Sequence, residues 1–409
     1  MTVHDLMRLK DSRIELVAET PPAKTLSEDL AERARRVAAV AALHAAEVDR
    51  DGRFPAEAIN AARAHGLLGL MAPADLGGEA ASLSQVAEVC YLLGQACAST
   101  ALIYAMHQVK VACVIRHGRG SPWHEAFIRR LVIDQLLLAS STTEGNNGGA
   151  VRSSEAPIER QGGRITLERA ASVISYGAYA DAVVTTARRD AEASGSDQVL
   201  TVFPRADFTL ERTIVWDTLG VRGTCSAGFT LRAKGVAEQI LPAPYETIHA
   251  QSMVPTAHVL WSSVWAGIAA AAVEKARKYL RKGAKSGEIS PSAPYFTRAN
   301  AHLRALRALI ATSLDRFETI ADDAEALEAM DFQSEISLLK VDASELAVAA
   351  VQAALRCTGL SGYRNDTDIT IGRHLRDVLS APIMISNDRI LANTAASALL
   401  VEVAGAIRD

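Results

Sequence analysis

The chain has 409 residues, a formal net charge of −4, 49% hydrophobic residues and only 5% aromatic residues. This slightly acidic charge and the scarcity of aromatic rings argue against nucleic-acid binding, which needs a basic surface and base stacking. The five cysteines include no close pair, which argues against a disulfide framework and a metal site. A reducing cytoplasm is therefore the expected location.

No segment is expected to span a membrane. The first 19 residues lack the apolar core of a signal peptide. The longest apolar run, residues 259–273, is interrupted by Ser262, Ser263 and Gly267, which is typical of a buried helix.

Residues 1–134 are predicted to form an α-helical domain. Residues 30–40 and the alanine-rich stretch after them combine strong helix formers with helical apolar spacing. Phe54-Pro55 opens a second helix, since proline is tolerated in a first turn. One long apolar helix is predicted from about Leu83 through Ala101 toward Ile115.

Residues 135–245 are predicted to form a β domain. Short runs rich in valine and threonine alternate here with clusters of glycine, serine and aspartate. The simplest arrangement of such strands is an antiparallel barrel or sandwich.

Residues 246–409 are predicted to be helical again. Leu303, Leu306, Ile310 and Leu314 share one helix face, and a later helix stops at Gly359, a plausible C-terminal cap. A last helix is expected to begin near residues 386–388 and to run to about Ile407. The expected fold class is α+β, in the order helices, strands, helices.

Three motifs resemble the acyl-CoA dehydrogenase superfamily. They are Phe54-Pro55 with the glycines that follow it to Gly78, Trp216–Ser226, and Gly359–Ile390, the last of which includes the pair Arg376-Asp377. The resemblance implies an α-helical N-terminal domain, a β-barrel or sandwich middle domain and a C-terminal four-helix bundle. It also implies a flavin cofactor, FAD or FMN, and a homotetramer or homodimer.

The resemblance places the flavin at two segments of the middle domain. Residues 142–150 resemble the family's flavin-binding loop, which makes Thr142, Thr143, Gly148 and Gly149 candidate cofactor ligands; a plain turn is the alternative. Val173-Ile174-Ser175 resembles the strand beside the flavin ring, with Val173 where the family has tryptophan. A hydroxyl or N–H at Ile174 or Ser175 would lie beside the flavin atom that gains charge.

The adenosine end of the cofactor matches the family pattern poorly. Arg281 falls where relatives reach the FAD of a neighbouring subunit, and Arg356 and Gly359 fall in a second, altered motif. A solvated helix end is an equal alternative for Arg281. These departures leave room for FMN, a loosely held flavin or no flavin.

The catalytic glutamate of the family is replaced by Ile385, and the alternative glutamate position is near Ala257. Dehydrogenation of an acyl thioester needs a carboxylate at the α-carbon, which isoleucine cannot supply. Asp388 and His258 are the candidate substitutes. Helix capping for Asp388 and a structural hydrogen bond for His258 are the competing interpretations. His107 falls in a region that borders the pocket in relatives, with helix packing as the alternative, and His374 is expected to face a subunit contact or solvent.

Three functions remain open at this point. The first is a flavin-dependent oxidoreductase acting on the CH–CH group of an acyl-CoA or related substrate with a non-standard base. The second is a flavin-dependent monooxygenase that uses reduced flavin and oxygen. The third is a non-catalytic relative that binds acyl groups or flavin. A small acyl or aromatic substrate and a flavin reductase or electron-transfer partner are expected, with no nucleic-acid or membrane partner.

Overall fold

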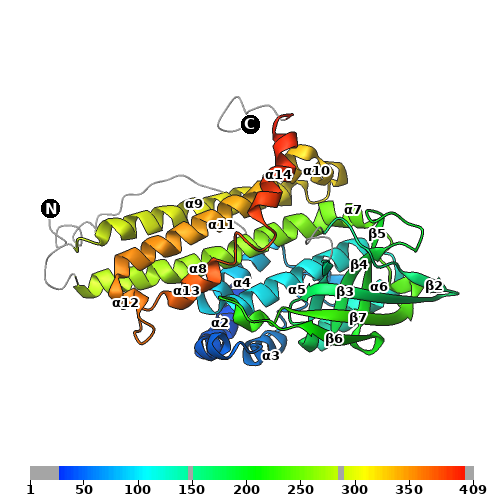
Figure 1. Cartoon of the computed structure of the whole chain (residues 1–409), viewed down its shortest axis with the longest axis horizontal. Coiled ribbons are helices and arrows are strands. Elements are labelled where there is room, and N and C mark those ends of the chain that lie inside the picture. Colours follow the sequence, from blue (N-terminus) through cyan, green and yellow to red (C-terminus); the bar gives the residue numbers. More distant parts are fainter. Residues whose placement is uncertain (1–26, 146–150, 284–289, 401–409) are drawn as a thin grey trace.

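The computed structural model describes residues 27–145, 151–283 and 290–400 (Figure 1). Gly148 and Gly149 lie outside the described residues. Helices at both ends of the chain pack together and a β domain lies at one end of the long helices, so the predicted α+β class with a middle β domain is confirmed.

The N-terminal helices are α2 (Glu28–Asp51), α3 (Ala56–Ala64), α4 (Leu83–Ala96), α5 (Ala98–His117) and α6 (Pro122–Asp134). The prediction of one long helix from residue 83 was wrong, because Cys97 is extended (φ −151°, ψ 112°) and separates α4 from α5. Cys97 is the N-cap of α5 and makes no side-chain cap hydrogen bond, so the sequence carries no capping signal at the break.

The middle domain contains two sheets. Its strands are β1 (Leu138–Ser141), β2 (Glu159–Gln161), β3 (Arg164–Ile174), β4 (Ala182–Arg188), β5 (Gln198–Pro204), β6 (Phe208–Ile214) and β7 (Ala227–Val236). One sheet has the order β1-β4-β5 and the other β2-β3-β7-β6. The prediction of a purely antiparallel arrangement was wrong, since β1 pairs with β4 in parallel. A parallel neighbour requires a long crossover, and β2 and β3 lie in it.

The C-terminal helices begin with α7 (Tyr245–Ile248), a π-helical segment (His249–Met253) and α8 (Val254–Gly283). They continue with α9 (Ala293–Ile320), α10 (Ala324–Glu328), α11 (Met330–Thr358), α12 (Leu360–Tyr363), α13 (Gly372–Val378) and α14 (Asn387–Ala398). The predicted apolar face of α9 is buried, and Gly359 ends α11 with φ 55°, as predicted. In the described residues α14 ends at Ala398, before the predicted Ile407.

The predicted domain boundaries fall near changes of element type. The first, after residue 134, lies between α6 and β1, and the second, after residue 245, lies in the first turn of α7. All five cysteines are free in the structure.

Two helical segments, Ala98–His117 and Tyr245–Gly283, are long and apolar enough to cross a membrane by composition alone. The expectation that no apolar segment reaches this length was therefore too strict. In each segment 89% of the apolar window is buried inside the protein, as in the core helices of soluble proteins.

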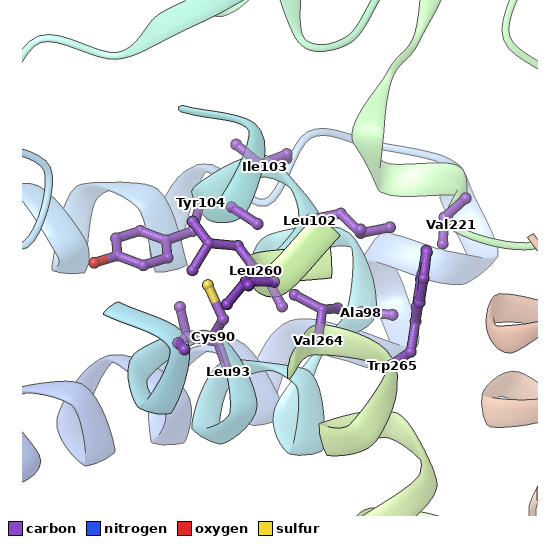
Figure 2. Close-up of a cluster of buried hydrophobic side chains, with 14 of the residues drawn as sticks. Cys90, Leu93, Ala98, Leu102, Ile103, Tyr104, Val221, Leu260, Val264 and Trp265 are labelled. Carbon is purple, nitrogen blue, oxygen red and sulfur yellow. The ribbon is translucent and has the colours of Figure 1, made fainter. Parts of the chain in front are cut away.

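The central core forms where α4, α5 and α8 meet (Figure 2). Leu102, Leu260 and Trp265 are at most 1% exposed there. The backbones of α4 and α8 approach closely at Gly94 and Gly267: a Cβ on Gly267 would lie 2.4 Å from the Tyr91 carbonyl oxygen. Glycine is therefore required at this crossing, because any side chain would push the two helices apart.

The Arg376-Asp377 pair joins the three parts of the chain. Arg376 forms an ion pair with Asp49 of α2 and donates to the Leu219 carbonyl oxygen at 2.9 Å. The Asp377 carboxylate accepts a hydrogen bond from the Val221 N–H at 2.7 Å. A Cβ on Gly220 would lie 2.1 Å from the Arg376 carbonyl oxygen, so the loop after β6 is pressed against α13.

We predict that Asp377→Asn changes how stability depends on pH. Burial raises the pKa of the Asp377 carboxyl to about 6 from 3.8, although the Val221 N–H opposes the shift. A raised folded-state pKa gives a stability contribution that is complete below about pH 4 and lost as pH rises through about 6. Asparagine retains an acceptor for Val221 and does not titrate.

The difference in unfolding free energy between Asp377→Asn and the wild type should therefore shift in favour of the variant by up to about 3 kcal/mol as pH rises from 4 to 7. Urea unfolding at several pH values measures this difference. Asp134→Asn, at an exposed position at the end of α6, is the matched control. A difference that stays constant with pH would contradict the prediction.

Candidate functional site

The two segments expected to contact the flavin ring lie side by side. Thr142 and Thr143 follow the end of β1, and Glu144 pairs with Ala171 of β3 in an isolated bridge. The Ser172 hydroxyl donates to the Thr143 hydroxyl at 3.1 Å. The structure therefore brings the predicted loop and the predicted strand into contact.

A β-bulge shapes the end of β3. Its pairing with β7 shifts between Ala171 and Ile174, and Val173 turns outward with 38% of its surface exposed. The Ile174 side chain is fully buried, so only its backbone can meet a ligand. The Ser175 hydroxyl accepts from Ser226 at 2.8 Å. Bulges leave backbone groups unpaired and re-aim side chains, which suits a binding edge.

Glu144 fixes the start of the flavin-candidate loop, a role that the sequence did not reveal. Its carboxylate is 4% exposed and accepts from the N–H groups of Glu155 at 2.6 Å and Ala156 at 3.2 Å. The Arg169 guanidinium lies 3.6 Å away. These contacts hold the carboxylate inside the domain, where it orients the loop.

Two cavities lie near the candidate cofactor residues. One of about 290 Å³ is beside the loop and is lined by Glu144, Gly145, Glu155, Ala156, Glu168 and Ala170. The three carboxylates that line this cavity disfavour the binding of a phosphate there. A second cavity of about 600 Å³ lies between the C-terminal end of α8 and the residues after α12.

The adenosine-end candidates lie far from the ring candidates within one chain. Arg281 is exposed in the last turn of α8, and Gly359 precedes α12, at the opposite end of the bundle from the β domain (Figure 1). Arg356 donates to the Tyr295 hydroxyl at 2.7 Å and stacks 4.2 Å from that ring. A flavin that used both groups would have to bridge two subunits.

A buried lysine holds the segment around Ile385, where the sequence predicts that the family's catalytic glutamate is missing. Ile385 has φ 51°, and its carbonyl oxygen accepts from the Lys340 ammonium at 2.7 Å. The same ammonium donates to the Asn387 side-chain oxygen at 2.7 Å and lies 5.8 Å from the Trp265 ring centroid. Burial lowers the pKa of Lys340 to about 8. The one feature of the sequence that could have indicated a buried lysine here is its position within the apolar run Leu338–Val341.

The two candidate bases occupy different environments. Asp388 is exposed in the first turn of α14, while the Ser386 hydroxyl caps that helix by accepting from the Arg389 N–H. His258 is buried, and its Nδ1 donates to the Ile336 carbonyl oxygen at 2.8 Å. Burial lowers the pKa of His258 to about 4, so the ring is neutral at pH 7. Ala257, the alternative glutamate position, is 4% exposed.

The other two histidines are also buried and neutral at pH 7. His107 accepts from the Leu138 N–H and lies 2.8 Å from the Leu68 carbonyl oxygen, which joins α5 to β1. His374 was expected to face either solvent or a subunit contact. It does not face solvent, since it is only 6% exposed. Burial lowers the pKa of His107 to about 4 and that of His374 to about 3.

The sequence matches two family models over separate ranges. Residues 26–121 match the acyl-CoA dehydrogenase N-terminal domain and residues 259–387 match the acyl-CoA dehydrogenase C-terminal domain. The cyclohex-1-ene-1-carbonyl-CoA dehydrogenase of Geobacter metallireducens is 25% identical over 87% of this chain and 93% of its own length. The probable FMNH2-dependent monooxygenase SfnC of Pseudomonas putida is 24% identical over 88% and 90%.

Solved structures share the fold. FMN-bound TdsC from Paenibacillus sp. A11-2 superposes with a TM-score of 0.80 at 19% identity, covering 92% of this chain and 98% of its own. KijD3 in complex with FMN and a dTDP-amino sugar gives a TM-score of 0.79 at 22% identity over 93% and 96%. At these identities the likeness describes the fold.

We predict that Lys340→Met loosens the segment around Ile385. The substitution keeps an apolar stem and removes the ammonium that binds the Ile385 carbonyl and the Asn387 side chain. Hydrogen exchange of the amides of residues 383–389 should become faster by about tenfold, since charge-assisted hydrogen bonds contribute about 1.5–3 kcal/mol each. Mass spectrometry of peptic peptides measures the rate.

Lys275→Met is the matched control for this variant, because Lys275 also donates from a buried stem to a carbonyl, that of Thr370. It should leave exchange at residues 383–389 unchanged. Equal exchange of those residues in wild type and Lys340→Met would show that Lys340 does not hold the segment.

Proposed function

Because the chain belongs to the acyl-CoA dehydrogenase superfamily, whose members are flavin-dependent oxidoreductases, we propose that it is a flavin-dependent monooxygenase on this scaffold. The proposal rests on Ile385, an apolar residue where the resemblance predicts the family's catalytic glutamate, and on the buried Lys340 ammonium that binds its carbonyl. In monooxygenation one oxygen atom enters the substrate and the other leaves as water, with both electrons supplied by the reduced flavin.

The surroundings of Ile385 disfavour proton abstraction from an acyl-CoA. A base for that step must touch one C–H bond from within an apolar pocket. Ile385 and Ala257 are both apolar, and Asp388, the described carboxylate nearest to Ile385 along the chain, is exposed. His258 is neutral and already donates one N–H to a carbonyl, which leaves it as the base to test if dehydrogenation occurs.

The curated relatives include both reaction types. One relative is named as an acyl-CoA-type dehydrogenase and another as a probable FMNH2-dependent monooxygenase, at nearly equal identity. The solved structure of TdsC is named as a dibenzothiophene monooxygenase. These names support a small acyl or aromatic substrate and a separate flavin reductase as the electron source for this chain.

The proposed cofactor is a flavin, FAD or FMN. Its ring would lie against Thr142, Thr143, the backbone of Ile174 and the hydroxyl of Ser175, which the structure groups at the ends of β1 and β3. For FAD, the adenosine end would meet the groups at the far end of the bundle in another subunit. Those groups are Arg281, Arg356 and Gly359.

A homotetramer or homodimer in the cytoplasm is the proposed state. Large apolar side chains are exposed on α12 and just after α14: Leu360 at 72%, Tyr363 at 73% and Leu399 at 87%. We take the pair on α12 as a candidate association surface. The bridging geometry of the two cofactor ends supports the same conclusion, and light scattering of the purified protein measures the mass.

We predict turnover with reduced flavin and oxygen, without reduction of bound flavin by acyl-CoA. Purified protein is mixed anaerobically with a panel of acyl-CoAs while flavin absorbance is followed. It is separately supplied with reduced FMN or FAD, ¹⁸O₂ and a panel of aromatic and acyl compounds. The expected outcome is no bleaching in the first experiment and substrate-dependent ¹⁸O incorporation in the second.

Bleaching by any acyl-CoA would refute the monooxygenase proposal in favour of dehydrogenation. His258→Ala would then test the replacement base. Absence of flavin binding under all conditions would instead favour the non-catalytic relative.

We predict that Thr143→Val weakens flavin binding by about fivefold and that Ser175→Ala does the same, since a neutral hydrogen bond contributes about 1 kcal/mol. Quenching of flavin fluorescence during titration with FAD and FMN measures the affinity. Thr209→Val, at an exposed position on β6, is the matched control. Unchanged affinity in both variants would remove these hydroxyls from the flavin site.

A further inference from the structure

Two buried donors converge on one sulfur atom between α5, α7 and the π-helical segment. The Lys110 ammonium lies 3.6 Å from the Met253 Sδ, and the Tyr245 hydroxyl lies 3.3 Å from the same atom. Lys110 and Tyr245 are each 2% exposed. A thioether is a weak acceptor, so two strong donors share a partner that satisfies neither.

The Lys110 ammonium is the less satisfied of the two. Among the described residues it forms no ion pair, and its one hydrogen bond is the contact to Met253. Burial of an ammonium is costly unless an anion or several oxygen acceptors compensate it. Burial lowers the pKa of Lys110 to about 8, so the group remains mostly protonated at pH 7.

The surrounding charges favour an anion at this point. Arg169 is also buried, and its Nε and Nη2 have no hydrogen-bond partner in the described residues. Its ion-pair partner Glu144 is already bound by two backbone N–H groups. The His249 ring, 5.6 Å from the Tyr245 ring, is neutral at pH 7 because burial lowers its pKa to about 3.

The donor pair lies next to the expected substrate pocket. Met253 ends the π-helical segment and packs in the same apolar cluster as Ala257, the alternative base position, one turn further along. Single π-helical turns frequently mark functional sites. Methionine is unbranched and flexible, so its thioether can move aside for an oxygen acceptor.

We propose that the Lys110 ammonium and the Tyr245 hydroxyl form a binding site for a carboxylate group, at the position that the Met253 Sδ takes in this structure. Two oxygens of a carboxylate would accept one hydrogen bond from each donor and neutralise the buried ammonium. The identification of that carboxylate ligand as the substrate rests on the proposed function; the binding site itself does not.

The test is calorimetric titration of the purified full chain, with its flavin as isolated, using benzoate and hexanoate as probes. Benzamide and hexanamide are the neutral probes of matched shape. Wild type should bind each carboxylate at least about tenfold more tightly than its amide, because a charge-assisted pair is lost in the amide. Lys110→Met and Tyr245→Phe should each weaken carboxylate binding, Lys110→Met by roughly tenfold or more.

Lys275→Met removes an ammonium on α8, away from the Lys110 site on α5, and should leave carboxylate binding unchanged. Equal binding of carboxylate and amide, no saturable binding of benzoate and hexanoate, or binding retained in both pocket variants would overturn the proposal. If Lys110→Met does not fold, Tyr245→Phe decides, because it removes a single oxygen atom. No step depends on oxygen or reduced flavin, so failure here is distinguishable from failure of the monooxygenase proposal.

Discussion

The relative placement of the three parts of the chain depends on the buried Asp377 carboxylate and its neighbour Arg376. Asp377 accepts the Val221 N–H from the loop after β6, while Arg376 pairs with Asp49 of the first described helix. Because Gly220 has no side chain, the backbone of the loop can contact the backbone of α13 at this point. The β domain and the segment around Ile385 are thereby fixed against the same helices, and any site between them inherits this geometry.

The segment around Ile385 combines the predicted loss of a catalytic carboxylate with a buried lysine that supports its backbone. The Lys340 ammonium uses two of its protons on the Ile385 carbonyl and the Asn387 side chain, which supports a left-handed residue at position 385. Only neutral acceptors and the Trp265 ring surround it in the described residues. The segment around Ile385 therefore has a positively charged support and an apolar side chain at the predicted position of the catalytic glutamate.

Buried cations recur in the interior near the expected pocket. Lys110 and Lys340 both have a lowered pKa because of burial, and Arg169 has unpaired nitrogens. Such an interior favours ligands with oxygen acceptors or negative charge over neutral hydrocarbon chains.

The sequence by itself determined the order of helices and strands, the cap at Gly359 and the replacement at Ile385, because periodicity, glycine and motif order are local properties of the chain. The tertiary structure alone decided the break at Cys97, the parallel pairing of β1 with β4 and the burial of Lys110. The sequence alone does not tell whether a lysine is exposed or buried, because its surroundings are formed by residues that are distant in sequence. The fold could therefore be predicted from sequence pattern and resemblance, whereas the buried charges at the candidate site are set by the tertiary structure.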